Sequence, residues 1–312
     1  MQVYRGMEGL EGKFDSPVIT LGNFDGVHRG HLGIFKQLKA FATKRGVEAV
    51  LFTFEPHPVK VLRPELGPPL ITTLSKKLKL IKDAGIDAVI LADFTKEFAA
   101  QHPASFVDEI LCDKLKIQMA VVGHDFTFGK GKEGTIELLS EKGATAGFDV
   151  HIVEALKING EIVSSTKIRQ HIAEGDVSIA ASFLGRPYSV EGKVVRGDNR
   201  GKQLGFPTAN IDVEGELFPG NGVYAVNVEV GGNTMAGAAN VGVRPTFDTK
   251  ERSIEVHIVD FNGSIYGESI RVDFIDRIRG EIAFPSPEAL SIQIQKDVAA
   301  AKEIAEKGRD ET

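Results

Sequence analysis

Two histidines stand three residues apart in the segment Gly22-Asn-Phe-Asp-Gly-Val-His-Arg-Gly-His31, between an apolar run and an amphipathic stretch. This order is typical of a strand that leads through a turn into a helix. Free N–H groups and the helix dipole attract anions at a helix start, and Gly30 allows a phosphate to approach the backbone. His28 and His31 add directed donors. The pattern therefore predicts phosphoryl or nucleotidyl transfer rather than two ordinary turn residues.

A second potential anion site is the segment Ser164-Ser-Thr-Lys-Ile-Arg169, where three hydroxyl side chains precede an arginine at the predicted start of a helix. Hydroxyls and helix N–H groups can hold a triphosphate, while the planar guanidinium of Arg169 compensates its charge. The alternative is a plain helix N-cap with a surface arginine. We expect this segment to act together with the two histidines.

Two further segments of the first half have features of ligand sites. The residues from Gly129 to Gly134 match the pattern G-x-G-x-x-G, but the preceding apolar run ends too early to feed into the glycines, and Thr135 stands where a Walker A loop has lysine. We favour a flexible loop near a ligand. Glu55 and His57 directly follow a predicted strand, which indicates either a ligand site at the sheet edge or a rigid turn between prolines.

The second half contains one glycine-rich turn and one strand with an acidic residue. In Gly201-Lys-Gln-Leu-Gly-Phe-Pro-Thr-Ala-Asn210, the side chains of Thr208 and Asn210 offer hard oxygen ligands for Mg²⁺. The alternative is a hairpin loop rich in turn residues. Glu255 lies in an alternating strand, where it could take a proton from a hydroxyl nucleophile or simply face solvent.

The elements that must position these residues alternate between short apolar runs and helical patterns through the first half of the chain. Strands that alternate with helices pair in parallel through right-handed crossovers. We therefore predict a doubly wound α/β domain. Its predicted strands cover 17–22, 47–54, 88–92, 119–123 and 149–153, and its predicted helices cover 31–45, 76–84, 103–114, 136–142, 166–174 and 177–184.

The sequence texture changes at Gly185-Arg-Pro187. Alternating runs separated by turn residues then predict a small antiparallel barrel or sandwich, with strands over 188–195, 222–230, 235–241, 253–260 and 269–274. A final helix is predicted to begin near Glu288 and to end near Lys307, with Ser286 as its N-cap and Pro287 at its first position. We place two domains, at residues 1–185 and 186–312.

Composition excludes several classes of protein. The chain has 312 residues, and its 37 Lys plus Arg against 43 Asp plus Glu give a formal charge of −6, the wrong sign for wrapping nucleic acid. Cys112 is the single cysteine, so no intramolecular disulfide can form. No apolar run reaches the roughly 18 residues of a membrane span, and residues 1–10 lack a signal-peptide pattern. We expect a cytoplasmic protein with neither nucleic-acid nor membrane partners.

Together these segments resemble the bacterial bifunctional riboflavin kinase/FAD synthetases. The resemblance extends over essentially the whole chain, and the motif from Gly22 to His31 and the motif Pro207-Thr-Ala-Asn210 occur in the family's order. It implies an N-terminal nucleotidylyltransferase domain of Rossmann-like fold that adenylylates FMN with ATP and releases pyrophosphate. It also implies a C-terminal β-barrel that phosphorylates riboflavin with ATP and Mg²⁺.

The resemblance further implies residue roles. His28 and His31 would bind ATP phosphates, and Glu255 would be the kinase base. The other ATP-binding residues of the N-terminal domain would be Gly22, Asn23, Phe24, Asp25, Ser164, Ser165, Thr166 and Arg169. Those of the kinase domain would be Gly201, Gly205, Pro207, Thr208 and Asn210, with Mg²⁺ on Thr208 and Asn210. The flavin-binding residues would be Asp125, Arg279, Glu281 and Phe284.

Three alternatives remain open from the sequence. The N-terminal site could act on a different phosphorylated acceptor, with the barrel as an accessory module. A non-catalytic flavin-binding regulator is opposed by the two sets of phosphate-handling residues. An RNA-linked role is opposed by the charge of −6 and by the absence of tryptophan for base stacking.

Overall fold

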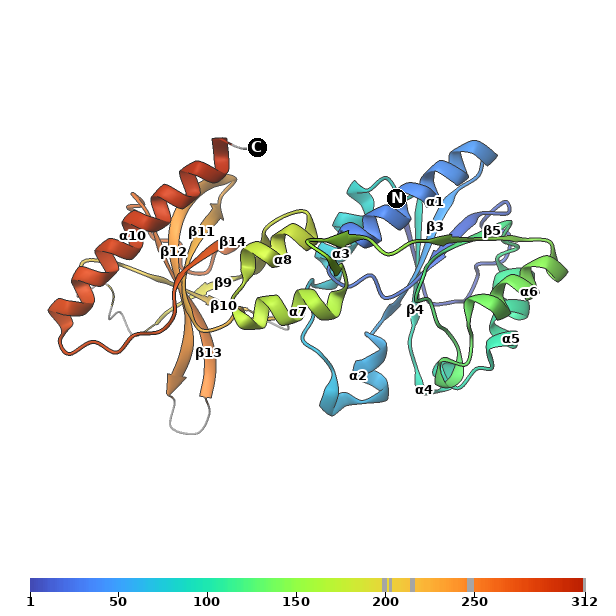
Figure 1. Cartoon of the computed structure of the whole chain (residues 1–312), viewed down its shortest axis with the longest axis horizontal. Coiled ribbons are helices and arrows are strands. Elements are labelled where there is room, and N and C mark those ends of the chain that lie inside the picture. Colours follow the sequence, from blue (N-terminus) through green and yellow to red (C-terminus); the bar gives the residue numbers. More distant parts are fainter. Residues whose placement is uncertain (198–200, 202–203, 214–216, 246–249, 311–312) are drawn as a thin grey trace. The chain divides into compact units, whose positions relative to one another are not determined.

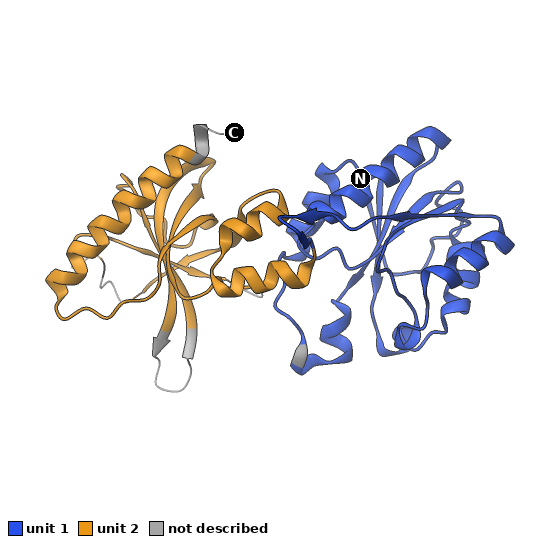
Figure 2. Cartoon of the chain, in the orientation of Figure 1, with its two compact units in different colours: residues 1–163 blue, residues 164–312 orange. Residues whose placement is uncertain are grey.

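The computed structural model describes residues 1–197, 201, 204–213, 217–245 and 250–310, and it divides into two compact units. Unit 1 is Met1–Val163 and unit 2 is Ser164–Thr312 (Figure 1, Figure 2). Residues 202–203 of the predicted glycine-rich turn lie outside the described residues. Each unit has its own sheet and its own core.

Unit 1 is built on a six-stranded sheet in which all neighbouring strands run parallel, in the order β1-β4-β3-β2-β5-β6. The parallel sheet confirms the predicted α/β fold. The sequence pattern missed β1, because this edge strand is mostly exposed and has no apolar run. The strands are β1 (Gln2–Arg5), β2 (Val18–Leu21), β3 (Ala49–Glu55), β4 (Ala88–Asp93), β5 (Met119–Gly123) and β6 (Asp149–Val153), and a short hairpin of β7 (Lys157–Ile158) and β8 (Glu161–Ile162) follows.

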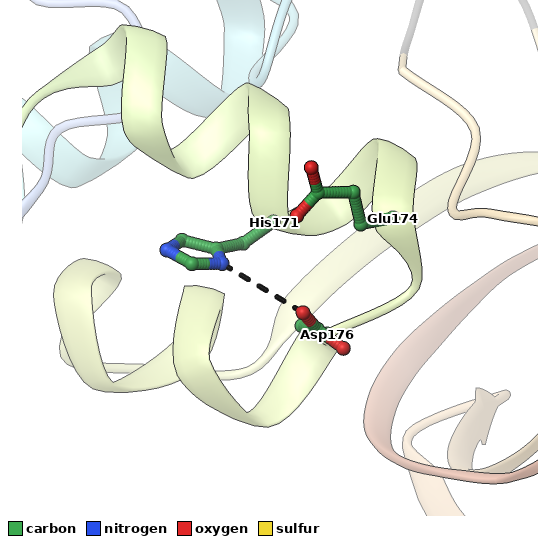
Figure 3. A group of neighbouring side chains, drawn as sticks. All are labelled: His171, Glu174 and Asp176. Carbon is green, nitrogen blue, oxygen red and sulfur yellow. Dashed lines mark ion pairs between the residues drawn. The ribbon is translucent and has the colours of Figure 1, made fainter.

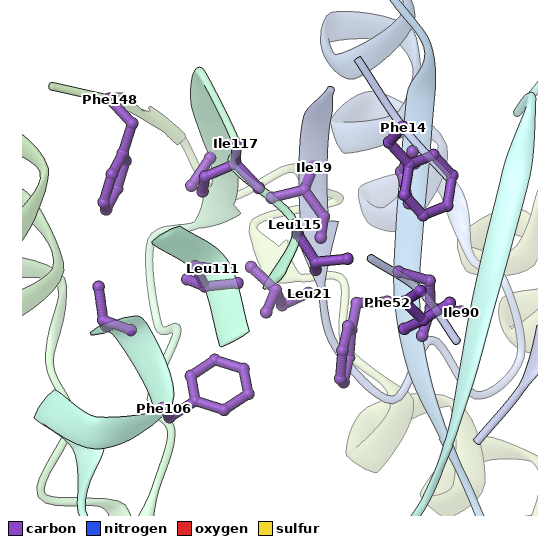
Figure 4. Packing of buried hydrophobic residues seen from close by; sticks show 14 of the residues in the cluster. Phe14, Ile19, Leu21, Phe52, Ile90, Phe106, Leu111, Leu115, Ile117 and Phe148 are labelled. Carbon is purple, nitrogen blue, oxygen red and sulfur yellow. The ribbon is translucent and has the colours of Figure 1, made fainter. Parts of the chain in front are cut away.

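Helices cover both faces of this sheet. Val18 and Leu51 pack with residues of α1 and α3 on one face, whereas the next residues along the same strands, Ile19 and Phe52, pack with residues of η2 and α6 on the other (Figure 4). Successive side chains of a strand point to opposite faces, so strands buried on both sides have continuous apolar runs. The helices are α1 (Arg29–Arg45), α2 (Pro58–Leu62), η1 (Pro64–Leu66), α3 (Leu74–Asp83), α4 (Lys96–Ala99), α5 (Pro103–Ser105), η2 (Phe106–Lys114), η3 (Lys130–Lys132) and α6 (Ile136–Ala146).

The prediction of one helix over 103–114 was wrong in detail. The short helix α5 is followed by η2, which is a π-helix. The wide turns of a π-helix join residues five apart, as in the bond from the N–H of Leu115 to the carbonyl of Ile110 (2.9 Å). Phe106 and Leu111 of this π-helix are buried in the core of unit 1.

Unit 2 contains a closed antiparallel barrel with the strand order β10-β13-β12-β11-β14-β9. This confirms the predicted barrel. Several details differ: the sequence pattern missed β10, β12 and β14 continue beyond their predicted ends at 241 and 274, and β13 begins before its predicted start at 253. The strands are β9 (Tyr188–Val195), β10 (Ala209–Asp212), β11 (Gly222–Val230), β12 (Asn233–Pro245), β13 (Lys250–Ile258) and β14 (Ser269–Arg279).

The C-terminal helix α10 (Pro287–Asp310) packs on β11, β12 and β14. Its start is as predicted, because the hydroxyl of Ser286 accepts a hydrogen bond from the N–H of Ala289 (3.3 Å) and Pro287 is the first helical residue. Ala225, Ala238 and Ala301 form the contact between helix and barrel. Small side chains allow a helix to approach a sheet closely, so α10 closes one side of the barrel.

Two helices precede the barrel, α7 (Ser165–Glu174) and α8 (Val177–Leu184), and both belong to unit 2. Helix α8 packs on β9 and β14, and the N–H of Gly220 donates to the carbonyl of Ile172 in α7 (2.9 Å). By their internal contacts, the compact units therefore divide at 163/164. The domain boundary at 185/186 stays a prediction. The change of sequence pattern at Gly185 marks the place where helix α8 ends and the first barrel strand follows. Such a change does not report where the packed core of a unit ends.

Candidate active sites

The turn between β2 and α1 brings His28 and His31 together at the start of the helix. His28 is the N-cap, because its Nδ1 accepts a hydrogen bond from the N–H of His31 (3.2 Å). In a neutral imidazole, an accepting Nδ1 leaves the proton on Nε2, so His28 can donate from Nε2. A Cβ atom on Gly30 would stand 3.1 Å from the His28 ring. Glycine at this position thus lets the ring lie against the backbone.

The two imidazole rings stack with their centroids 3.5 Å apart and their planes at 19°. Phe24 contacts the ring of His31 edge-on, at 5.2 Å between centroids. Burial, followed by the neighbouring His28 and Lys77, lowers the pKa of His31 well below 6.5. Its Nδ1 is buried and has no hydrogen-bond partner among the described residues. A buried polar atom of this kind at a helix start is suited to a polar ligand atom.

Asp25 has a structural connection that its predicted role did not include. Its carboxylate is buried and accepts hydrogen bonds from the N–H groups of Ile71 (3.1 Å) and Thr72 (3.2 Å) and from the hydroxyl of Thr72 (3.2 Å). The same hydroxyl accepts a hydrogen bond from the N–H of Gly26 (3.1 Å). Asp25 therefore ties the turn before α1 to the segment before α3, and it fixes the position of the histidines.

Lys77 in α3 is a site residue that the sequence reasoning missed. It is 7% exposed, and its Nζ donates to the carbonyl of Asn23 (3.3 Å) and to the hydroxyl of Thr53 (3.3 Å). Burial lowers the pKa of Lys77, while Glu55 and Asp25 act in the opposite direction. Lys77 stands four residues before Ile81, the other buried residue of α3. A lysine on the apolar face of a helix was the signal available in the sequence.

Glu55 and His57 line a small pocket at the carboxyl end of β3, together with Asn23, Asp25 and Lys77. The Nδ1 of His57 accepts a hydrogen bond from the N–H of Val59 (3.3 Å), so His57 also caps the short helix α2. A capped turn therefore forms one wall of this pocket, and the ligand site at the sheet edge stays a prediction. Ligands of parallel α/β sheets bind at this edge.

The segment from Ser164 to Arg169 begins α7, as predicted. The hydroxyl of Ser164 accepts a hydrogen bond from the N–H of Lys167 (3.3 Å), which makes Ser164 the N-cap and places Ser165, Thr166 and Arg169 in the first two turns. These residues belong to unit 2, whereas the two histidines belong to unit 1. The chain leaves unit 1 beside the histidine turn, because the carbonyl oxygen of Val163 is 3.7 Å from a Cβ placed on Gly30.

The loop from Gly129 to Gly134 is not a dinucleotide-binding loop. The backbones of Phe128 and Gly134 exchange two hydrogen bonds (3.0 and 2.9 Å), which closes the loop on itself. It follows β5 only after a further turn, and α6 begins later, with Thr135 as its N-cap. Asp125 lies in that further turn and is exposed, with its side chain 3.9 Å from His124.

In the barrel, Glu255 on β13 pairs with Asn210 on β10 and with Asn240 on β12. Residues paired across antiparallel strands point to the same face, so the three side chains lie in one row. The neighbours Ile254 and Val256 are fully buried, which puts this row on the outer face of the barrel wall. Asn240 was missed because its significance depends on strand register.

Asn210 carries the observation that best fits a ligand. Its side chain is 5% exposed, and its Oδ1 is buried without a hydrogen-bond partner among the described residues. A Cβ placed on Gly197 would stand 2.0 Å from the Nδ2 of Asn210, so the side chain is held against the backbone of Gly197. Together with the half-buried hydroxyl of Thr208, these oxygens form a hard donor set that fits Mg²⁺.

The turn before Asn210 is closed by its own backbone and by His257. The N–H of Phe206 donates to the carbonyl of Gly201 (2.8 Å), and the Nδ1 of His257 lies 2.9 Å from the carbonyl of Pro207, to which it donates. Gly205 has φ +88°, a conformation that favours glycine. His257 follows Glu255 on the same face of β13, so one strand positions both the acidic residue and the turn.

The loop after β14 holds Arg279, Glu281 and Phe284, the three predicted flavin contacts in unit 2. Arg279 makes an ion pair with Asp297 of α10 (2.7 Å), and its guanidinium lies 5.6 Å from the ring centre of Phe284. Glu281 accepts a hydrogen bond from the side chain of Asn221 (3.1 Å). Arg279 is thus a link within the protein, which the sequence did not reveal. Asp125 belongs to unit 1, whereas the other three predicted flavin residues belong to unit 2.

A separate group of possible metal ligands lies at the junction of α7 and α8, where His171, Glu174 and Asp176 place one ligand atom each within 4.8 Å of one another (Figure 3). The Nδ1 of His171 is 3.9 Å from a carboxylate oxygen of Asp176. However, the carboxylate of Glu174 accepts a hydrogen bond from Gln170 (3.0 Å), and the cationic Arg277 donates to the carbonyl of Glu174 (3.1 Å). These contacts stabilise the helix junction.

Comparison with known proteins also assigns different enzyme families to the first and second parts of the chain. Residues 12–167 match the family model for FAD synthetase, and residues 184–305 match the model for riboflavin kinase. The bifunctional riboflavin kinase/FMN adenylyltransferase of Escherichia coli (strain K12) is 36% identical over 306 residues, which cover 97% of this chain and 98% of that protein. The chain belongs to this bifunctional family. The family member of Bacillus subtilis (strain 168) is 39% identical over 286 residues, 90% of each chain.

A solved structure described as a "Macrolide-efflux Protein from Streptococcus pneumoniae" is also similar over almost its whole length. It has a TM-score of 0.88 and 32% identity, and the match covers 96% of this chain and 99% of that one. Within the part of the chain that the structure describes, no helix is both long and apolar enough to cross a membrane. The family assignment rests on the sequence relatives above.

Proposed function

We propose that this member of the bifunctional family makes FAD from riboflavin in two steps, one at each site described above. The chain is a riboflavin kinase and an FMN adenylyltransferase, with ATP, riboflavin, FMN and FAD as substrates or products. The two matched models favour FMN as the acceptor over a different phosphorylated molecule. A cytoplasmic location suits an enzyme that consumes ATP twice.

In the kinase step, Glu255 is the general base. Its carboxylate takes the proton of the terminal ribityl hydroxyl, the oxygen attacks the γ-phosphorus of ATP, and ADP leaves. The pairing of Glu255 with Asn210 puts this carboxylate beside the residues assigned to the nucleotide. His257 keeps the turn at Pro207 in place, so that base and nucleotide site have a fixed spacing.

We assign Mg²⁺ to the oxygens of Thr208 and Asn210 in unit 2. The supporting observation is the buried Oδ1 of Asn210, which has no partner among the described residues. When bound there, the ion would neutralise charge on the ATP phosphates. The backbone of Gly201 and Gly205 shapes the turn over the nucleotide.

In the adenylylation step, a phosphate oxygen of FMN attacks the α-phosphorus of ATP, and pyrophosphate leaves. The attacking oxygen is already ionised, so this site needs donors and cations rather than a base. His28 donates from Nε2, and a neutral His31 offers its imidazole at the start of α1. Ser164, Ser165, Thr166 and Arg169, at the start of α7, are also assigned to the binding of ATP.

The stacked pair of His28 and His31 at a helix N-terminus is the observation that supports the adenylylation site most strongly. The test combines His28→Asn, which retains an N-cap side chain, with His31→Asn. Purified variant and wild type are incubated with ATP and Mg²⁺ and either riboflavin or FMN, and FMN and FAD are separated by chromatography. We expect the variant to form FMN but no FAD. Undiminished FAD formation by the folded variant would contradict the assignment.

A further inference from the structure

Lys77 differs from the other lysines of α3 in its surroundings. Its side chain is 7% exposed, whereas Lys79, two residues on, is exposed to solvent. The Nζ of Lys77 donates to the carbonyl of Asn23 (3.3 Å) and to the hydroxyl of Thr53 (3.3 Å). Both partners are neutral groups. Lys77 thus places a cation beside the turn that carries the site residues. Its hydrogen-bond partners among the described residues are a carbonyl and a hydroxyl, not a carboxylate.

Burying an ammonium group costs free energy unless a counter-ion compensates it. Asp25 and Glu55 attract the charge of Lys77 and so partly offset the cost of its burial. The carboxylate of Asp25 is engaged with the N–H groups of Ile71 and Thr72. A buried cation in this setting is poorly explained by stability alone, since an aliphatic side chain could fill the same space.

The position of Lys77 offers an explanation. It lines the pocket at the carboxyl end of β3, next to Asn23, Asp25, Glu55 and His57. Through Asn23 it contacts the same turn that ends in the N-cap His28. Its charge also acts on His31, where it adds to burial and to His28 in lowering the pKa of that imidazole.

We propose that Lys77 is a positioning residue for adenylyl transfer, which anchors the turn before α1 to β3 and supplies the positive charge behind the two imidazoles. The inference rests on the proposed role of His28 and His31. Lys77 holds the Asn23 carbonyl, so the start of α1 keeps its place when a polyanion binds. Its charge favours the neutral form of His31 and attracts phosphate.

The test compares Lys77→Met with the matched control Lys79→Met on the same helix, using wild type and the His28→Asn/His31→Asn variant as references. FAD formation from FMN and FMN formation from riboflavin are measured separately, together with thermal unfolding. We expect Lys77→Met to lower kcat/KM for FAD formation by roughly 10²-fold, the effect of losing one preorganised electrostatic group. Its melting temperature and its kinase activity should stay close to wild type, and Lys79→Met should retain both activities.

The pH dependence of kcat/KM for FAD formation distinguishes a positioning role from a merely structural one, because loss of a merely structural lysine would not change it. The groups that face His31 are His28 and Lys77, and those that act on Lys77 are Asp25 and Glu55, with His57 in the same pocket. Without the charge of Lys77, protonation of His31 becomes easier. The acidic limb of the kcat/KM profile for FAD formation should therefore move to higher pH in Lys77→Met. Lys77→Arg, which keeps the charge, should leave that limb near its wild-type position.

Three results separate the possible failures. Wild-type kcat/KM and an unmoved acidic limb in folded Lys77→Met would overturn the inference while leaving the proposed function intact. The inference would also be overturned if Lys77→Met lost activity only in proportion to a fall in its melting temperature, and if Lys77→Arg and Lys77→Met had the same pH profile of kcat/KM. Full FAD formation by the double histidine variant would overturn the proposed site and the inference together.

Discussion

Glu255 is the residue whose proposed role is most directly tested by one substitution. Glu255→Gln keeps the volume of the side chain and the pairing with Asn210 but removes the charge that accepts the proton. A general base contributes about 10²–10⁴-fold in rate. We expect FMN formation to fall by that factor, while FAD formation from supplied FMN persists. If FMN formation stays near normal in a steady-state assay, Glu255 is only a strand residue and another group takes the proton.

His31 makes the stability of unit 1 depend on pH. Its pKa in the folded protein is well below 6.5, mainly because the ring is buried. Below pH 6.5 the unfolded chain takes up a proton at His31 that the folded chain does not. As the pH is lowered, the free energy of unfolding therefore decreases by up to about 1.4 kcal/mol per pH unit. This decline continues until the folded-state pKa is reached.

Urea unfolding at a series of pH values checks this prediction. His31→Gln cannot titrate, so its unfolding free energy should depend less on pH between neutrality and the acid range than that of wild type. The effect should be seen with a probe that reports on unit 1. Equal slopes in the two proteins would mean that His31 takes up its proton at the same pH in the folded and unfolded states.

At the scale of elements, the connection between β14 and α10 depends on one ion pair. Asp297 is 3% exposed and accepts hydrogen bonds from Arg279 (2.7 and 3.0 Å) and from Gln293 (2.9 Å). Removing one partner of a buried pair costs roughly 3–5 kcal/mol, because the other charge stays buried. Asp297→Asn should therefore lower the melting temperature of unit 2.

Asp297→Asn should also raise KM for riboflavin more than it lowers kcat, because Arg279 holds the loop with Glu281 and Phe284. Kinase assays over a range of riboflavin concentrations measure both constants. The matched control is Lys302→Met, also in α10, which breaks the exposed ion pair between Lys302 and Asp260 (3.0 Å). This variant should change neither the melting temperature nor KM. An unchanged melting temperature in Asp297→Asn would show that α10 is held by its apolar face alone.

At the scale of the whole molecule, the place at which the chain can be divided is a matter of packing. We propose that residues 164–312 fold alone and form FMN, and that residues 186–312 form a less stable fragment. The shorter fragment loses Val177, Phe183 and Leu184, all buried, and full burial of such a side chain stabilises by about 1.5–3 kcal/mol. Thermal unfolding and kinase assays of the two fragments compare them. Equal melting temperatures would favour the boundary at 185/186.

The sequence by itself determined much of the fold. Apolar runs identified five of the strands of unit 1, since a strand buried on both faces leaves a continuous apolar signal. Alternation in the second half identified the barrel strand with Ile254, Glu255 and Val256, whose burial alternates as predicted. The turn motif at His28 and the caps at Ser164 and Ser286 also depend on local chemistry, which neighbouring residues fix without the rest of the chain.

Only the tertiary structure decided which distant residues meet. Lys77 reaches Asn23 and Arg279 reaches Asp297 across long stretches of sequence, and nothing in their local pattern identifies the partner. The row of Asn210, Glu255 and Asn240 depends on strand register, and a shift of one residue would point each side chain to the opposite face. Periodicity reports that a face is buried but not what buries it, so the packing of α8 on the barrel and the limit of each unit came from the fold.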